Sequence, residues 1–213
     1  MFKRLLSSLR NKNQPADTAP DEPAQEREMI VAYDAHGQEM HIARNEWREK
    51  VFLPDLEKKW DDADALYTAI LMGLKDAFAS DLVAAAERLV DIDRNPERSH
   101  TLHGIVLMET GHLDAAEQTL REGMDKSGAT GTLLTNLAKV FAERGEDKRA
   151  DDTLWQAIQT DPNLDNGLLW WVSIQRERGG EGAYIEGLRS VAAMPGSWRA
   201  QLWMRSEEHT SEL

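Results

Sequence analysis

The sequence contains no cysteine, and this absence excludes disulfide bonds, thiol chemistry and metal sites built on sulfur. It suits a reducing compartment, and we expect the protein to be cytoplasmic. No apolar stretch approaches the length that a membrane-spanning helix needs. The first residues, "MFKRLLSSLR", have apolar side chains at helical spacing, interrupted by serines and arginines. They therefore lack the continuous apolar core of an export signal.

Patterns typical of catalytic and nucleotide-binding sites are also lacking. The glycine-rich stretch Arg176–Tyr184 follows a predicted helix, whereas a phosphate loop follows a strand and usually carries a lysine. We interpret it as a turn between helices. His100 and His103 have a spacing that two zinc ligands could use, but catalytic zinc needs three protein ligands and no third one is placed nearby. We therefore expect no catalytic activity, no metal and no cofactor.

The net charge of −13 is unevenly distributed along the chain. Residues 1–12 have no acidic residue, so the remainder is more acidic than the total indicates. An acidic surface repels phosphate backbones, so we expect no nucleic-acid binding and favour a protein or peptide partner, possibly basic. Residues 1–10 could also touch an anionic membrane as a short amphipathic helix, although a frayed terminus is the favoured interpretation. The basic residues of positions 1–12 are Lys3, Arg4, Arg10 and Lys12.

Residues 11–28 contain three prolines and almost no apolar side chain, which is typical of a disordered linker. An alternation with a period of two then predicts a β-hairpin with a four-residue turn at Asp34–Gly37. Two short helices come next, with Asn45 as the N-cap of the first and Pro54 in the first turn of the second. Residues 29–62 are expected to cap the helical region that begins at Ala63. We expect the hairpin to have one apolar face, formed by Met29, Val31, Tyr33, Met40 and Ile42.

From Ala63 onward the sequence is helical in pattern and repeats every 34 residues. The shift aligns turn glycines and the apolar residues of the helices on either side. A glycine between two amphipathic helices at this period is typical of a helix–turn–helix solenoid. Two of the aligned series are Gly111, Gly145 and Gly179, and Leu120, Leu154 and Leu188.

The repeat resembles the tetratricopeptide repeat family, and we expect a bacterial member. Residues 97–130 and 165–198 match with some departures, and residues 63–96 are in phase but degenerate, since Gly73 does not match. The resemblance implies an all-α, right-handed solenoid over residues 63–204, preceded by the small hairpin. Residues 131–164 match closely, through Leu134, Leu137, Ala138, Phe141, Ala150, Leu154, Ala157 and Pro162.

In this family the first helices of the repeats line a concave groove that binds peptides. Asn136 matches the central asparagine of members that grip a C-terminal carboxylate, but the other places of that clamp do not match, so we reject this activity. Trp170 has two open interpretations, as a groove anchor or as core packing. The resemblance implies groove positions at Arg98, Thr101, Ile105, Thr132, Thr135, Asn136, Lys139, Asn166, Trp170, Ser173 and Arg176.

The last nine residues, "RSEEHTSEL", resemble a translated sequencing adapter, so residues 205–213 are expected to be artefactual. The stretch Ser197–Met204 looks like the start of another first helix, and it is too apolar for a polar capping face. We therefore expect further repeats or another domain beyond it.

The most consistent function is a non-catalytic scaffold that binds a protein or peptide along the concave face. Two alternatives stay open. One is the regulatory or substrate-docking region of an enzyme whose catalytic domain is lost by truncation. The other is a membrane-peripheral assembly factor.

Overall fold

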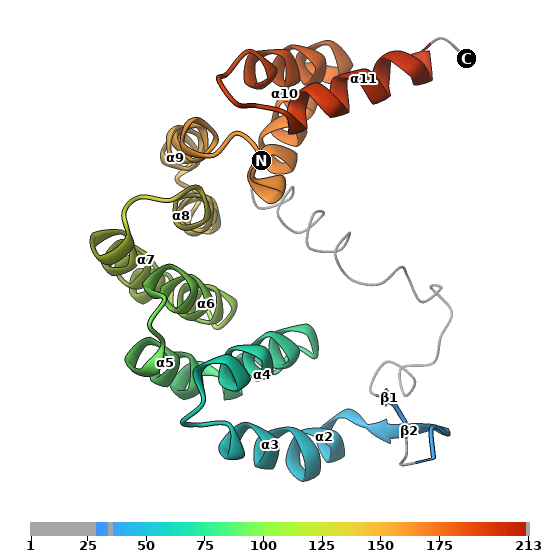
Figure 1. Ribbon diagram of the computed structural model, residues 1–213, viewed down its shortest axis with the longest axis vertical. Helices are drawn as coiled ribbons and strands as arrows, with labels where there is room; N and C mark the ends of the chain where they lie inside the picture. Colours follow the sequence, from blue (N-terminus) through green and yellow to red (C-terminus); the bar gives the residue numbers. More distant parts are fainter. Residues whose placement is uncertain (1–28, 34–35, 212–213) are drawn as a thin grey trace. The chain divides into compact units, whose positions relative to one another are not determined.

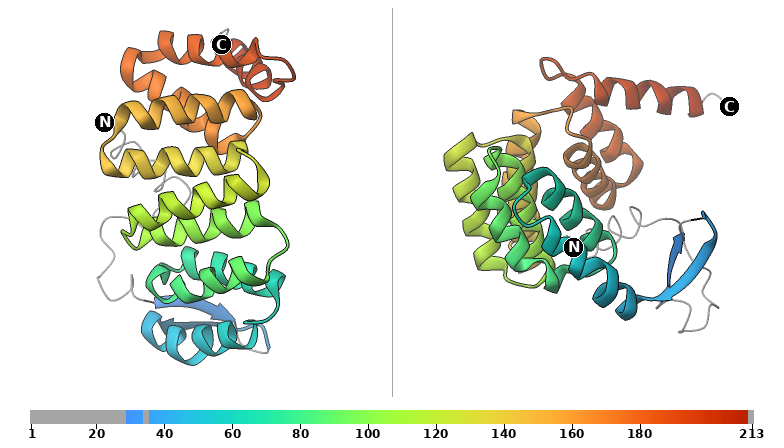
Figure 2. Two further views of the ribbon diagram at one scale, coloured as in Figure 1. Left: turned by 90° about the vertical axis from the view of Figure 1, so that its left-hand side faces the viewer. Right: turned by 60° about the horizontal axis from the view of Figure 1, so that its bottom comes forward.

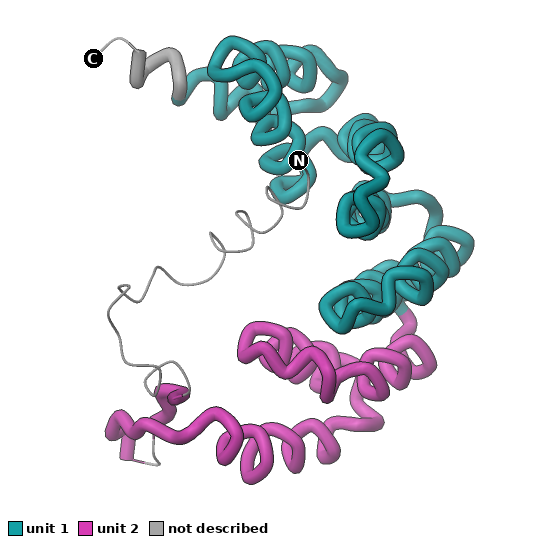
Figure 3. The backbone as a smooth tube through the Cα atoms, turned by 180° about the vertical axis from the view of Figure 1, so that it is seen from behind, with its two compact units in different colours: residues 1–13, 95–213 teal, residues 14–94 magenta. Residues whose placement is uncertain are grey.

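The computed structural model describes residues 29–33 and 36–211, with side chains up to Ser206 (Figure 1). The predictions for residues 1–10 and 11–28 lie outside the described residues, as does part of the hairpin turn. The described chain divides into two compact units, one ending at Arg94 and the other beginning at Asn95 (Figure 3).

In the first of these units, strands β1 (Met29–Tyr33) and β2 (Glu39–Ala43) pair antiparallel as a two-stranded sheet. Tyr33 pairs with Glu39, so the connection is one residue longer than the predicted four-residue turn. Because successive side chains point to opposite faces, a one-residue change of register turns the second strand over. The expectation of one shared apolar face was therefore wrong: Met40 and Ile42 lie on the face opposite Met29, Val31 and Tyr33.

The stretch after the hairpin is one continuous helical segment rather than two helices. It consists of α2 (Arg44–Trp47), the π-helical turn η2 (Arg48–Phe52) and α3 (Leu53–Lys58). Ala43 rather than Asn45 occupies the N-cap of α2, and no side chain caps this helix. The physical reason is that Ala43 is still paired in the sheet when the helix begins.

Helices α4 (Ala63–Lys75) and α5 (Val83–Ile92), with the 3-10 turn η3 (Ala79–Asp81) between them, complete this unit. The degenerate position Gly73 has a clear packing role here. A Cβ added at Gly73 would lie 2.5 Å from the ring of Phe52. That ring packs against Phe78 with centroids 5.1 Å apart. Phe52 therefore occupies space that a side chain at position 73 would need.

The second unit consists of six helices that follow one another as antiparallel neighbours in stacked layers (Figure 2). They are α6 (Pro96–Glu109), α7 (Leu113–Ser127), α8 (Gly131–Arg144), α9 (Asp147–Thr160), α10 (Asp165–Ala192) and α11 (Arg199–Ser211). Helix α10 spans 28 residues but is broken by non-helical backbone at Gly179 and Gly180. Its two parts therefore correspond to the two helices of one repeat, and the turn predicted within Arg176–Tyr184 is confirmed.

The turn between paired helices contains a residue with positive φ at or next to the same place in each repeat. Gly111 and Gly145 adopt φ of +81° and +78°. Ala77, one period before Gly111, is the non-glycine residue in the described chain with positive φ, at +61°. In α10 the left-handed conformation falls on Gly180, one residue after the predicted Gly179.

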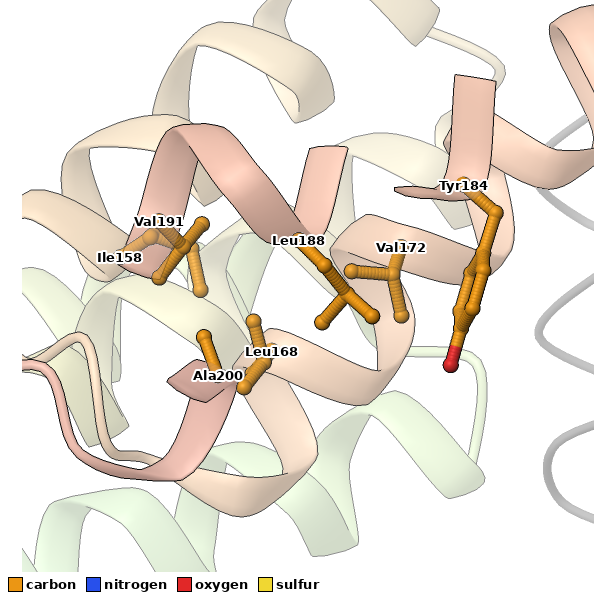
Figure 4. Close-up of a cluster of buried hydrophobic side chains, with 7 residues drawn as sticks. All are labelled: Ile158, Leu168, Val172, Tyr184, Leu188, Val191 and Ala200. Carbon is orange, nitrogen blue, oxygen red and sulfur yellow. The ribbon is translucent and has the colours of Figure 1, made fainter. Parts of the chain in front are cut away.

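The helix pairs bury their apolar faces against each other. At Gly104 an added Cβ would lie 2.8 Å from the side chain of Leu120, so α6 and α7 approach closely there. A further cluster of buried side chains joins α9, both parts of α10 and α11 (Figure 4). Its members are Ile158, Leu168, Val172, Tyr184, Leu188, Val191 and Ala200.

An ion pair recurs at two successive interfaces between repeats, again with a period of 34. Arg144 at the end of α8 pairs with Glu117 of α7, and Arg178 in α10 pairs with Asp151 of α9. Arg144 also donates to the carbonyl oxygen of Leu113 at 3.0 Å. These contacts tie the C-terminal ends of two first helices, α8 and the first part of α10, to the repeat before each of them.

Candidate peptide-binding face

The residues predicted for the groove lie on α6, α8 and the first part of α10, all within one unit. Helix α8 is in contact with both of the other two. We call the side of these three helices that carries the predicted residues the groove face. The predicted residues thus lie on neighbouring helices. What the groove face can bind depends on which of their polar groups have no partner within the protein.

On α8, the groove face carries a stripe of Thr132, Asn136, Lys139 and Glu143. Their spacing of three and four residues places them on one side of the helix. Phe141, which the family pattern assigns to the interior, is buried. The stripe is therefore the polar side of a helix that uses other positions for its core contacts.

Asn136 is nearly buried, with 6% of its surface exposed. Its amide nitrogen donates to the carbonyl oxygen of Thr132 at 2.9 Å. Its amide oxygen has no hydrogen-bond partner in the described part of the chain. A buried acceptor without a donor costs about 1–3 kcal/mol. This oxygen is closed to solvent, so a ligand N–H group can pair with it only after the side chain rotates.

Lys139 lies one helical turn further along the same stripe. Burial lowers the pKa of its ammonium group. Within the residues that the structure describes, it makes no ion pair or hydrogen bond. A lysine in such surroundings gains from an added acceptor, because a buried charge is costly unless it is paired. A backbone carbonyl or carboxylate of a ligand would provide this acceptor.

Neighbouring hydroxyl groups add to the polar character of the groove face. The side-chain oxygens of Thr101 on α6 and Thr135 on α8 are buried and have no hydrogen-bond partner among the described residues. The hydroxyl of Ser173 on α10 is already used, since it donates to the carbonyl oxygen of Leu169 at 2.7 Å. Both oxygens are closed to solvent, however, and that of Thr135 lies beside Gly167, so it faces the contact between α8 and α10.

Two predicted positions on α10 have structural contacts. Trp170 is only 1% exposed, which fits the core-packing interpretation better than that of an open anchor. Arg176 forms an ion pair with Glu181 at 3.0 Å, and its guanidinium lies 3.7 Å from the ring centroid of Tyr184. These contacts bridge the turn between the two parts of α10. A role in binding stays a prediction for both residues.

The remaining predicted positions are Arg98 and Ile105 on α6, Thr132 on α8 and Asn166 on α10. Arg98, Ile105 and Thr132 are half-buried, and Asn166 is exposed. Their contribution to binding stays a prediction.

Sequence reasoning missed a row of glutamates at the end of the groove face. Glu109, Glu143 and Glu177 follow one another at the 34-residue period, one on each first helix. Glu143 is half-buried and Glu177 is exposed, and neither forms an ion pair or hydrogen bond in the described chain. We call these three residues the glutamate row. The 34-residue alignment of the sequence contains this signal, one position beyond the last groove place that the family resemblance implies.

His100, one of the two histidines with a spacing that zinc ligands could use, is held by contacts within the protein. The Nδ1 atom of buried His100 lies 2.8 Å from the carbonyl oxygen of Pro96. Its Nε2 atom lies 3.1 Å from the ammonium of Lys126. Burial lowers the pKa of His100, and the charge of Lys126 acts in the same direction. Both ring nitrogens are thus engaged by the protein itself.

Among the side chains that the structure describes, no group of three or more histidines and carboxylates is arranged to hold a metal ion. None of the described helices combines the length and the apolar character needed to cross a membrane.

The chain was compared with known proteins. No protein-family model matches the sequence, and no curated protein matches it significantly. Among solved structures it is similar to TTC0263, a thermophilic TPR protein in Thermus thermophilus, with 15% identity and a TM-score of 0.55 over 74% of this chain and 87% of that one. It is also similar to MamA, with 12% identity and a TM-score of 0.51 over 77% of this chain and 89% of that one.

At these identities the likeness concerns the fold alone. It agrees with the paired helices, the turn residues in phase and the ion pairs that recur between repeats. The protein therefore has an all-α fold, a tetratricopeptide-like helix–turn–helix solenoid with a small N-terminal β-hairpin.

Proposed function

We propose that this protein is a non-catalytic interaction module that binds a protein or peptide segment on its groove face. The observation that carries the proposal is the pair formed by Asn136 and Lys139. Asn136 offers a buried amide oxygen and Lys139 a half-buried ammonium, and neither of these two groups has a partner in the described chain. An extended peptide offers N–H and C=O groups that can satisfy both.

The charge of the groove face supports a partner with basic side chains near its contact with the glutamate row. Glu143 and Glu177 are available for such side chains, since neither is paired in the described part of the chain. Lys139 is compatible with this partner because a backbone carbonyl, rather than a side-chain charge, can accept its hydrogen bond. The groove face would thus bind the peptide backbone at its centre, through Asn136 and Lys139, and basic side chains at one end, through Glu143 and Glu177.

The test is affinity capture from the native cell lysate with the full chain as bait. It is run beside an Asn136→Ala, Lys139→Glu double variant. A matched control changes an exposed amide and an exposed lysine on α9, as Gln156→Ala and Lys148→Glu. Thermal unfolding of all three baits verifies that each is folded.

A protein retained by the full chain and by the α9 control, but lost with the groove variant, is the expected result. Its interaction is then measured with the purified pair, for which we expect at least a tenfold weaker affinity in the groove variant. Equal capture by all three folded baits would contradict the proposal, because the binding surface would then lie elsewhere.

A further inference from the structure

We propose that residues 1–10 of the same chain occupy the groove face as an internal ligand, which an external partner must displace. This inference rests on the proposed function of the groove face. It adds a regulatory occupant that neither the fold nor the comparisons assign. The chain segment lies outside the described residues, so its fit is argued from its sequence and from the chemistry of the face.

The segment has the pattern of a helix that binds in a groove. Phe2, Leu5, Leu6 and Leu9 follow the spacing i, i+3, i+4 and i+7. This is the set of anchors with which an amphipathic helix contacts an apolar groove. The apolar side chains that the groove face offers to these anchors include exposed Leu169 and half-buried Ile105.

The basic residues of the segment are placed to meet the glutamate row. Lys3 and Arg10 are seven residues apart, so on a helix they lie on the same side, about 10 Å from each other. Packed helices lie about 8–10 Å apart. Glu143 and Glu177 lie on α8 and α10, two first helices in contact with each other, so their carboxylates are candidates to pair with Lys3 and Arg10.

The unpaired lysine of the groove face is compatible with this occupant. A helix leaves its last four carbonyl groups without partners inside the helix. These carbonyls are acceptors for the ammonium of Lys139, and a cation is favoured at that end of a helix. The segment thus supplies an acceptor for Lys139 and cations for the glutamate row, while it carries no acidic side chain of its own.

The tether makes even a weak contact effective. Residues 11–28 can extend over at most about 60 Å. A chain segment of this length gives its two ends an effective concentration of about 1 mM when the sites are within reach. If residues 1–10 bind the groove face with an intrinsic dissociation constant near 1 mM, they therefore occupy it about half of the time.

The absence of cysteine allows a clean test in the full chain. Ser8→Cys is combined with Ser173→Cys on the groove face, and the two thiols are joined by a short bismaleimide. The matched control combines Ser8→Cys with Ser190→Cys on the second part of α10. Both serines donate a hydrogen bond to a carbonyl of their own helix, at 2.7 Å in each case, so the two substitutions remove the same kind of contact.

We expect intramolecular cross-linking at position 173 to be at least fivefold faster than at position 190. Glu143→Lys with Glu177→Lys should reduce the rate at position 173 about fivefold, because two attractions become repulsions. The control reversals Asp125→Lys and Asp152→Lys, at exposed positions on α7 and α9, should leave it unchanged. Raising the salt concentration to about 1 M should also slow the reaction, since charges on the surface are screened.

Equal rates at positions 173 and 190 would overturn the inference, and so would cross-links that form only between separate chains. Vesicles of phosphatidylserine and phosphatidylcholine test the membrane alternative. Sedimentation of the chain with these vesicles, with no cross-linking at position 173 in their absence, would show that the segment binds lipid instead.

The two proposals fail in different ways. If cross-linking is absent but partner capture still depends on Asn136 and Lys139, the groove binds a partner and the internal ligand is wrong. If cross-linking occurs but a chain without residues 1–12 captures no partner through the groove face, the internal ligand stands and the proposed function fails. If both hold, removal of residues 1–12 should strengthen partner binding about twofold or more.

Discussion

Replacement of Glu117 by glutamine should destabilise the unit that begins at Asn95, because Glu117 joins two repeats. It pairs with Arg144 across the interface between α7 and α8. It also pairs with Arg121 of its own helix at 2.8 Å and with Arg149 of α9 at 3.3 Å. Glutamine keeps nearly the same shape, so the substitution removes charge without leaving a cavity.

The magnitude follows from the exposure of each partner. The side chains of Glu117 and Arg144 are only 17% and 18% exposed, so this pair should be worth about 1–2 kcal/mol. Arg121 and Arg149 are exposed, and each of their pairs should add only a few tenths of a kcal/mol. We therefore expect Glu117→Gln to cost about 2 kcal/mol, which corresponds to a decrease in melting temperature of about 6–8 °C for a unit of this size.

The assay is urea unfolding at neutral pH, with Glu186→Gln as the control. Glu186 forms an exposed pair with Arg189 at 2.7 Å, so its replacement should cost less than about 0.5 kcal/mol. Burial acts to raise the pKa of Glu117, but hydrogen bonds from Arg121 and Arg144 outweigh it, and the net pKa is lowered. The contribution of Glu117 should thus be present above the ordinary glutamate pKa and be lost as the pH falls through the lowered value.

A cost below about 0.5 kcal/mol for Glu117→Gln at low salt would refute the reasoning. The same would hold if the acid-induced loss of stability were identical in the wild-type chain and the variant. Either result would mean that the recurring ion pairs follow the repeat geometry without stabilising it.

Three further predictions concern single positions. Burial lowers the pKa of His100, so the unfolded chain binds a proton at this residue more readily than the folded chain does. The free energy of unfolding should therefore fall as the pH drops through about 6.5 towards the lowered pKa of the folded state. His100→Gln should flatten this dependence, which thermal unfolding at several pH values would measure. Ala77 has a φ of +61°, so Ala77→Gly should raise the free energy of unfolding by about 0.5–1 kcal/mol, and a decrease would contradict the strain assigned to this turn. Asn163 accepts hydrogen bonds from the backbone N–H groups of Trp198 at 2.9 Å and Arg199 at 3.1 Å, so Asn163→Ala should cost about 1–2 kcal/mol and increase amide exchange at the start of α11. Unchanged exchange there would show that α11 is held by its apolar contacts alone.

The repeat architecture could be predicted from the sequence because its signals are local and occur several times. Leu134, Ala138 and Phe141 are buried as their spacing on one helix requires. Gly145 adopts the left-handed conformation that ends α8. Each of these features depends on helix periodicity or on the conformational freedom of glycine, which act within a few residues. The period of 34 then repeated the same signal.

Details that depend on contacts distant in sequence could not be predicted in the same way. The hairpin register differed by one residue because the length of the connecting loop decides which strand face is buried. Gly73 looked like a defect of the repeat, and only the position of Phe52 explains why a larger side chain has no room there. Ala77 adopts the positive φ that usually needs a glycine, because it occupies the turn position that Gly111 and Gly145 occupy in later repeats.

The sequence alone determined the class of fold and the apolar sides of the helices, because helical periodicity specifies which residues share a side. The resemblance to tetratricopeptide repeats implied which positions belong to the groove face, and their role in binding stays a prediction. Tertiary structure decided which of these residues are available. Arg176 is engaged by Glu181 and Tyr184, whereas the amide oxygen of Asn136 and the ammonium of Lys139 have no partner in the described chain. The reason is physical: periodicity specifies the direction of a side chain, but its burial, charge state and hydrogen bonds depend on neighbours brought together only by packing.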